Sequence, residues 1–275
     1  MRTTVAVAPA WFCLVVNTAD AKAGQPAPVG RAEHHRPPVA TDIFSGLSDQ
    51  AKAVVMRRFV RREIARGAMV FWEGEPGGSI FVIESGRVRT FHTTTYGYKV
   101  TTGLWSRGYV LGLISSVAGD SRVLSAEAID HVGMLQLPGQ DLKPLVAEVP
   151  EFGWNLMKML AFMASSGVAR ATRLATESVP ARLAETLVAL AEMPDAYVDG
   201  SKAVISGISQ EEIANMVSAT RPWVTMTLTE FEKQGYLLRE RRRITIPDMP
   251  ALRKLAAGLA ERDAPQVFTT RQTAT

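Results

Sequence analysis

Four arginines stand close together near the C-terminus of this chain: Arg239, Arg241, Arg242 and Arg243. A run of this kind either forms a solvated edge or binds phosphate groups, because each guanidinium is charged and presents several N–H donors. The net charge of the whole chain is only +4, which by itself gives no indication of a nucleic-acid partner. The chemistry of the arginines therefore depends on the elements that hold them.

The other residue types offer little support for catalysis or metal binding. A single cysteine, Cys13, excludes an internal disulfide framework and a multi-cysteine metal site. The histidines show no metal-ligand spacing, and they are His34, His35, His92 and His131. No nucleophile–base pair, paired carboxylates or phosphate-cradling loop is recognisable. We therefore expect no enzymatic activity, no metal and no cofactor.

A short helix is predicted upstream of the arginines, at residues 210–217. Ser209 fits the N-cap position, and Glu212 three residues later completes a capping box. Ile213 and Val217 would be buried, and the small Ala214 would let a second helix cross closely. A turn is expected at residues 218–219.

A second helix is predicted to follow this turn, capped by Thr220. Pro222 suits the first turn of a helix, because its missing N–H would have no partner there. The spacing of Val224, Leu228 and Phe231 predicts the buried face. The opposite face would present Pro222, Thr225, Met226, Thr229 and Lys233, with Arg221 at its edge and Trp223 on its flank. Residues 236–238 and 244–246 then indicate a β-hairpin wing with the arginines between its arms.

The preceding part of the chain changes its pattern twice. Between residues 59 and 137, short apolar runs separated by glycines predict closely spaced strands, as in a small β-sandwich or barrel. Short helices are predicted at residues 48–57 and 141–146. A long helix over residues 151–177 has an apolar band through Leu156, Met159, Leu160, Met163 and Val168. That band must be buried against the barrel, a twin subunit or both. Ser178 and Pro180 begin a further helix.

The N-terminus is open to two interpretations. Residues 5–16 resemble a secretory signal, with a positive start, a short apolar stretch and small residues after it. The alternative is a non-native leader or an extension without fixed structure, which we favour because the rest of the chain resembles a cytoplasmic protein. Residues 23–40 are typical of a linker. No later segment approaches transmembrane length.

Three segments of the chain resemble the CRP/FNR family of bacterial transcription regulators. WEGEPGGSIFVIESGRV (residues 72–88) is similar to the β-roll of that family, and VPARLAETLVALAE (residues 179–192) to the helix that opens its DNA-binding domain. ISQEEIANMVSATRPWVTMTLTEFEKQGYL (residues 208–237) is similar to its DNA-binding signature. The resemblance covers about residues 42–248.

This resemblance implies an α+β fold with five segments. They are a disordered leader and linker (1–41), a cyclic-nucleotide-binding-like β-roll sensor domain (42–150), a dimerisation helix (151–177), a winged helix-turn-helix DNA-binding domain (178–250) and a C-terminal tail (251–275). It also implies a cytoplasmic homodimer that binds two-fold symmetric double-stranded DNA. RNA polymerase is a further candidate partner, and no membrane association is expected.

The resemblance also implies a set of effector-binding positions, and this chain departs from the family at most of them. Gly112 and Arg122 match residues that hold cyclic AMP in members that bind it. Leu113 and Val123 replace a glutamate and a serine of the family pattern. A threonine–serine pair on the long helix is also replaced. The candidate pocket residues are therefore Gly112, Leu113, Arg122, Val123, Gly167 and Val168.

Cyclic AMP is consequently not expected to bind. A buried polar group of a ligand that lacks its partner costs on the order of 1–3 kcal/mol, and several such partners are missing. Arg122 either binds an anion or pairs with Asp120 or Glu127, and we favour the pairing.

The resemblance further implies which residues read DNA. Arg221 matches an arginine that can bond guanine N7 and O6. Pro222 and Met226 replace a glutamate and a second arginine, and offer apolar contact to thymine methyl groups instead. Trp223 either rests on a sugar with its N–H toward a phosphate or packs against the wing. The candidate DNA contacts are Ser209, Gln210, Thr220, Arg221, Pro222, Trp223, Thr225, Met226, Thr229, Lys233, Arg241, Arg242 and Arg243.

The main hypothesis is thus a sequence-specific, homodimeric transcription regulator with an altered effector pocket. The alternative is a β-roll that senses a small molecule or binds a protein, with a helix pair that does not read DNA specifically. That alternative predicts only weak, salt-labile DNA binding independent of sequence, which the arginines alone could produce.

Overall fold

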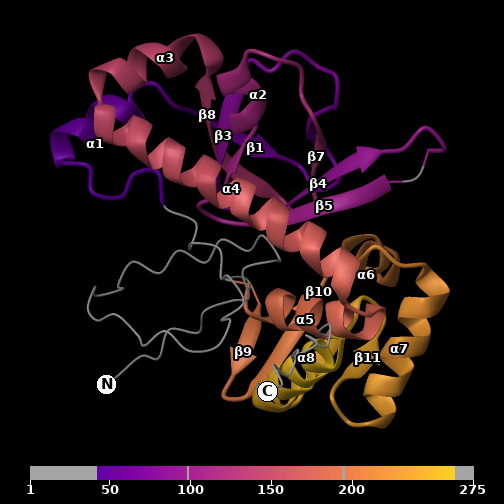
Figure 1. The fold of residues 1–275 in the computed structure, drawn as a ribbon. Coiled ribbons are helices and arrows are strands. Elements are labelled where there is room, and N and C mark those ends of the chain that lie inside the picture. The colour runs from indigo at the N-terminus through magenta and orange to yellow at the C-terminus, as the bar shows by residue number, and fades with distance from the viewer. Residues whose placement is uncertain (1–41, 98, 194–195, 264–275) are drawn as a thin grey trace, which may run out of the picture.

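The computed structural model describes residues 42–97, 99–193 and 196–263. The segment at residues 1–41, predicted as leader and linker, lies outside these ranges. The described chain forms an N-terminal β-roll, a long helix and a C-terminal module that contains the helix-turn-helix (Figure 1). Within these ranges, no helix combines the length and the apolar character needed to cross a membrane.

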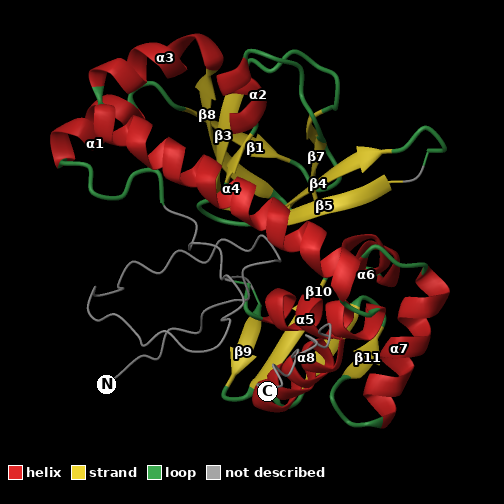
Figure 2. Ribbon diagram, viewed as in Figure 1, coloured by secondary structure: helices red, strands yellow, loops and turns green. Residues whose placement is uncertain are grey.

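The β-roll consists of two four-stranded antiparallel sheets, as the glycine-punctuated apolar runs predicted (Figure 2). One sheet has the order β1-β8-β3-β6 and the other β2-β7-β4-β5. The strands are β1 (Val60–Ile64), β2 (Met69–Phe71), β3 (Ser79–Ser85), β4 (Val88–Thr93), β5 (Lys99–Trp105), β6 (Val110–Leu111), β7 (Ser125–Ala128) and β8 (Val132–Pro138). The helices of this region are α1 (Asp49–Met56), α2 (Leu113–Ala118) and α3 (Gly139–Glu148).

The long helix, α4 (Pro150–Thr176), begins with proline, which is favourable at this position because its missing N–H needs no partner. Phe152, Leu156 and Met159 are buried against the roll. Val168, predicted to share their face, is instead 68% exposed on the other side of the helix. The predicted apolar band therefore combined residues from the buried face of α4 with Val168 from its exposed face, because both faces carry apolar residues.

The C-terminal module surrounds the helix-turn-helix with one sheet and two further helices. Its elements are α5 (Val179–Ala191), β9 (Tyr197–Asp199), β10 (Lys202–Ser206), α6 (Gln210–Val217), α7 (Arg221–Lys233), β11 (Leu238–Glu240), β12 (Arg243–Ile246) and α8 (Met249–Asp263). The sheet has the order β11-β12-β10-β9. The segment predicted as a tail begins with most of α8, whose Leu252 and Ala256 are buried in the core of this module.

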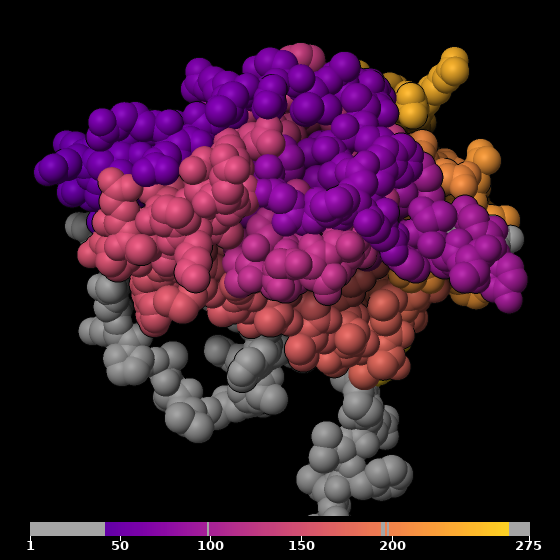
Figure 3. Space-filling view, turned by 90° about the horizontal axis from the view of Figure 1, so that it is seen from above, coloured from indigo at the N-terminus to yellow at the C-terminus, as the bar shows by residue number. Residues whose placement is uncertain are grey.

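The roll lies over the C-terminal module, whose residues appear at its edge when the molecule is viewed from above (Figure 3). Leu104 of β5 belongs to the hydrophobic core of the C-terminal module, whereas its neighbour Trp105 belongs to the core of the roll. Arg170 of α4 donates a hydrogen bond to the carbonyl of Thr101 at 2.7 Å. The roll and the C-terminal module are therefore in direct contact through β5, and α4 is bonded to the same strand.

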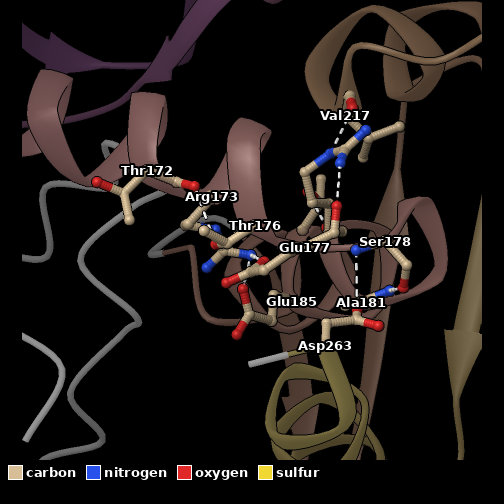
Figure 4. A network of polar contacts seen from close by, with 11 residues as sticks. Thr172, Arg173, Thr176, Glu177, Ser178, Ala181, Glu185, Val217 and Asp263 are labelled. Carbon is tan, nitrogen blue, oxygen red and sulfur yellow. Dashed lines mark hydrogen bonds and ion pairs between the residues drawn. The ribbon is translucent and has the colours of Figure 1, made fainter. Parts of the chain in front are cut away.

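The junction between α4 and α5 contains a buried network of ionic and polar contacts (Figure 4). Arg173 of α4 contacts the carboxylates of Glu177 and Glu185, and all three side chains are largely buried. Burial lowers the pKa of Arg173 to about 9, because it disfavours the charged form. This value is still above neutral pH, and the guanidinium therefore stays charged there. Asp263 of α8 accepts a hydrogen bond from the backbone N–H of Ser178 at 2.8 Å. The network thus joins α4, α5 and α8 at the connection between the two parts.

Candidate nucleic-acid interface and effector pocket

Helix α6 begins at the capping box that the sequence predicted. The backbone N–H of Glu212 donates to Ser209 Oγ at 3.2 Å, and the backbone N–H of Ser209 donates to Glu212 Oε2 at 2.6 Å. The helix ends at Ser218, which has a left-handed backbone conformation with φ of 53°. Thr220 then occupies the N-cap position of α7, but its side chain makes no capping hydrogen bond. The position of the cap is therefore as predicted, whereas the capping role of the threonine hydroxyl is wrong.

Helix α7 buries the three residues that the spacing predicted, Val224, Leu228 and Phe231. Its outer surface carries the exposed residues Arg221, Pro222, Trp223, Met226 and Lys233. Among the described residues, no side chain is bonded to the guanidinium of Arg221. The guanidinium of Arg221 is therefore free to bind a partner molecule at the N-terminal end of α7.

Two threonines on the outer surface of α7 are less available than predicted, because both are half-buried and bonded within the module. Thr225 Oγ1 lies 2.9 Å from Gln210 Oε1 of α6 and 2.9 Å from the carbonyl of Arg221. Thr229 Oγ1 donates to the carbonyl of Thr225 at 2.8 Å. Their methyl groups can still meet a partner, but the hydroxyl of Thr225 is bonded to α6 and that of Thr229 to the backbone of α7 itself.

The predicted wing is formed by β11 and β12, and the structure divides the arginine run. Arg241, Arg242 and Arg243 are exposed around the turn between the strands, where Arg242 has a φ of 56°. Arg243 lies 4.0 Å from Glu240. Arg239, by contrast, is turned toward α7 and is half-buried. Three of the four arginines thus form a surface that could bind phosphate.

The roll contains a small and mostly apolar cavity of about 70 Å³. Trp105 and Tyr109 stack in its wall, with ring centroids 3.5 Å apart and ring planes at 12°. The indole N–H of Trp105 donates to Thr90 Oγ1 at 2.7 Å, and Met163 of α4 also lines the cavity. Gly112, Leu113, Arg122 and Val123 line the cavity as well, so four of the six predicted pocket residues come together.

The other two predicted pocket residues, Gly167 and Val168, are exposed on α4 and do not line this cavity. The sequence reasoning did not identify Trp105 or Tyr109. Two aromatic residues on either side of the Arg107–Gly108 turn were the signal that could have pointed to them, because such a turn returns both rings to the same side.

Arg122 is only 5% exposed, and its guanidinium is hydrogen-bonded to neutral groups of the chain, while the charge of Glu75 also acts on it. It donates to the carbonyls of Gly112 at 3.0 Å and Ser79 at 2.6 Å, and to Ser115 Oγ at 3.0 Å. It also lies over the ring of Phe71, 4.4 Å from the centroid. Burial lowers the pKa of Arg122 from its usual value.

The predicted ion pair between Arg122 and Asp120 or Glu127 is wrong. Glu127 contacts Arg89 at 2.6 Å, because these residues face each other across β7 and β4. Gly112 permits the close approach of Arg122: a Cβ atom here would lie 2.3 Å from Arg122 Nη1, and the φ of 75° is itself unfavourable for other residues.

Known protein families match both the β-roll and the C-terminal module of this chain. Residues 61–149 match the model of the cyclic nucleotide-binding domain, and residues 181–255 match that of the Crp-like helix-turn-helix domain. Among curated relatives, the chain is similar to the CRP-like cAMP-activated global transcriptional regulator of Mycobacterium tuberculosis. The identity is 28% over 214 residues, which cover 78% of this chain and 96% of the relative.

Two further proteins give the same result. The transcriptional activator protein anr of Pseudomonas aeruginosa is 26% identical over 200 residues, which cover 73% of this chain and 82% of the relative. A solved transcriptional regulator of the CRP/FNR family from Thermus thermophilus superimposes with a TM-score of 0.60 at 25% identity, covering 73% of this chain and 100% of that chain. Since the two family models together span more than half of the sequence, the chain belongs to the CRP/FNR family of transcription regulators.

Proposed function

We propose that the protein is a homodimer that binds two-fold symmetric DNA sites specifically through α7, with an effector pocket that does not take cyclic AMP. The observation that carries the DNA-reading part is the available guanidinium of Arg221 at the exposed start of α7, next to the exposed arginines of the wing. The protein would act in the cytoplasm, where RNA polymerase is its candidate partner.

The exposed face of α4 supports the homodimer. Seven exposed apolar residues follow one another there at alternating spacings of three and four positions. They are Trp154, Met157, Ala161, Ala164, Val168, Ala171 and Ala175. This spacing is the a/d pattern of a two-stranded coiled coil, and the small alanines would let two helices approach closely. We call these seven residues the α4 seam. Met163 lies off the seam, because it lines the cavity of the roll.

A dimer related by two-fold symmetry would place two copies of α7 on one side of the DNA. The two half-sites would then be about one helical turn, roughly 34–36 Å, apart. Each half-site would hold one strongly specified G·C pair, read by Arg221, among positions that tolerate thymine through contacts with Pro222 and Met226.

Replacing Arg221 by alanine is expected to weaken binding to the preferred site by about 1–3 kcal/mol and to relax the preference at one base pair. The reason is the loss of a bidentate hydrogen bond to guanine, which no neighbouring exposed side chain can replace. Selection of binding sites from a random DNA library, for the wild type and Arg221→Ala, measures this directly.

Arg241→Ala is the matched control, since an arginine of the wing should weaken all sequences alike and leave the selected motif unchanged. If Arg221→Ala selects the same bases as the wild type, α7 does not read the major groove in the proposed manner.

Cyclic AMP is expected not to bind at micromolar concentration, and specific DNA binding is expected not to require it. Arg122 already uses three hydrogen bonds on the chain itself, while Leu113 is apolar where the family pattern has a glutamate. Isothermal titration calorimetry with cyclic AMP tests the first expectation. Titration of the same protein sample with its selected DNA site, in the absence of nucleotide, tests the second expectation. It also shows that the sample is able to bind DNA. A tight cyclic AMP isotherm would contradict this part of the proposal.

A further inference from the structure

Arg239 differs from the other three arginines of the run in what surrounds it. Its guanidinium contacts the carboxylate of Glu232 on α7, with Nε at 2.8 Å and Nη2 at 2.6 Å from Oε2. The backbone N–H of Arg239 donates to the other oxygen, Oε1, at 2.9 Å. Both oxygens of one carboxylate are therefore occupied by a single residue of the wing.

The same guanidinium also reaches one turn further along α7. Nη2 donates to Thr229 Oγ1 at 3.0 Å, and Nη1 lies 3.5 Å from the carbonyl of Thr225. Thr225, Thr229 and Glu232 are spaced by four and three residues, so they lie on one side of the helix. On α6, Gln210 contacts the hydroxyl of Thr225. The outer part of α7 is thus held between α6 and the wing.

These contacts leave Arg239 poorly suited to bind a phosphate. All three nitrogens of its guanidinium already point to acceptors of the protein, and the adjacent Glu232 offsets its charge. Hydrogen bonds from Arg239 also lower the pKa of Glu232, which keeps this carboxylate charged at neutral pH. Arg241 and Arg242 have no such partner among the described residues, and both are exposed.

We propose that Arg239 is a positioning residue, which with Glu232 fixes the wing against α7 so that wing arginines and Arg221 meet the DNA together. This inference rests on the proposed reading of DNA by α7. The wing and the helix carry different kinds of contact, to phosphates and to bases. Holding them at one relative orientation before binding removes an entropic cost that would otherwise weaken the complex.

The sign of the effect of Glu232→Gln separates this proposal from a purely electrostatic role. Removing a negative charge beside DNA strengthens binding if only charge matters. If Glu232 holds the wing in place, the same substitution weakens binding to the specific site, by about 10-fold for a broken contact of ordinary strength. Fluorescence anisotropy with the selected site, at a series of salt concentrations, gives both affinity and salt dependence.

Arg239→Met is expected to weaken specific binding to a similar extent, with the slope of log K against log salt unchanged. Arg242→Ala, the matched control, is expected to lower the magnitude of that slope by about 0.9 for each phosphate that the arginine no longer neutralises. The double variant Arg239→Met/Glu232→Gln should bind about as weakly as either single variant, because both break the same ion pair.

Two results would overturn the proposal: tighter DNA binding by Glu232→Gln, or a loss of slope in Arg239→Met equal to that in Arg242→Ala. Thermal unfolding checks that each variant is folded. If either variant is not, Arg239→Lys and Glu232→Asp keep the charges but change the geometry, and the same loss of affinity is expected. A wild type without any specific binding would instead refute the proposed function, so the two failures are distinguishable.

Discussion

Val168→Asp is expected to convert the protein into a monomer that no longer binds its DNA site specifically. Val168 is 68% exposed in the single chain and lies in the α4 seam, so it has no part in the core of either module. In the proposed dimer, two copies of an aspartate would face each other in an apolar interface, where like charges without partners are strongly unfavourable. Sedimentation velocity at micromolar concentration measures the change of mass.

DNA binding provides the second measurement on this variant. Each monomer would still carry one α7 and one wing, so weak binding that is independent of sequence should remain while the specific complex is lost. Ala53→Asp is the matched control, because Ala53 is an exposed alanine of α1 and is not part of the α4 seam. It should stay dimeric and bind normally. A wild type that sediments as a monomer, or a Val168→Asp variant that remains a dimer, would refute the proposed dimerisation through α4.

Arg173→Ala is expected to lower the free energy of unfolding by about 3–5 kcal/mol. The substitution leaves the buried carboxylates of Glu177 and Glu185 near each other without the cation that both contact. An unpaired buried charge costs more than a surface ion pair contributes, so the loss should be large. Urea unfolding followed by circular dichroism measures it.

Arg58 provides a matched surface control. It pairs with Asp141 at 3.3 Å and Glu148 at 3.4 Å, but it is 40% exposed, so Arg58→Ala should cost less than about 1 kcal/mol. A triple variant, Arg173→Met with Glu177→Leu and Glu185→Leu, should recover much of the lost stability, since it removes all three buried charges together. An Arg173→Ala variant as stable as Arg58→Ala would show that the network contributes little.

Local signals in the sequence were sufficient for the helix-turn-helix. The capping box of Ser209 and Glu212 and the apolar spacing of Val224 and Leu228 depend only on residues within a few positions. Hydrogen bonds at helix ends and the helical period act over that range, so the sequence predicted both helices. Glycines between apolar runs likewise predicted the β-roll, although the strands β1, β5, β6 and β7 and the short helix α2 were not identified.

The sequence alone could not decide which side of α4 meets the roll. Met163 and Val168 were placed in one band, yet the first lines the cavity and the second is exposed. Both faces of this helix are apolar, and a period of 3.6 residues cannot tell which of two apolar faces packs within the chain. Only the position of the roll separated the α4 seam from the buried face.

Pairings between distant residues were also decided by the tertiary structure. The sequence placed Arg239 in one run with three other arginines and favoured an ion pair over anion binding for Arg122, but Arg239 is bonded to Glu232 and Arg122 to neutral groups. The order of residues thus determined the elements and the family, because capping, turns and periodicity are local. The partners of each buried charge depended on how helices and sheets pack, since packing brings together acceptors that are far apart along the chain.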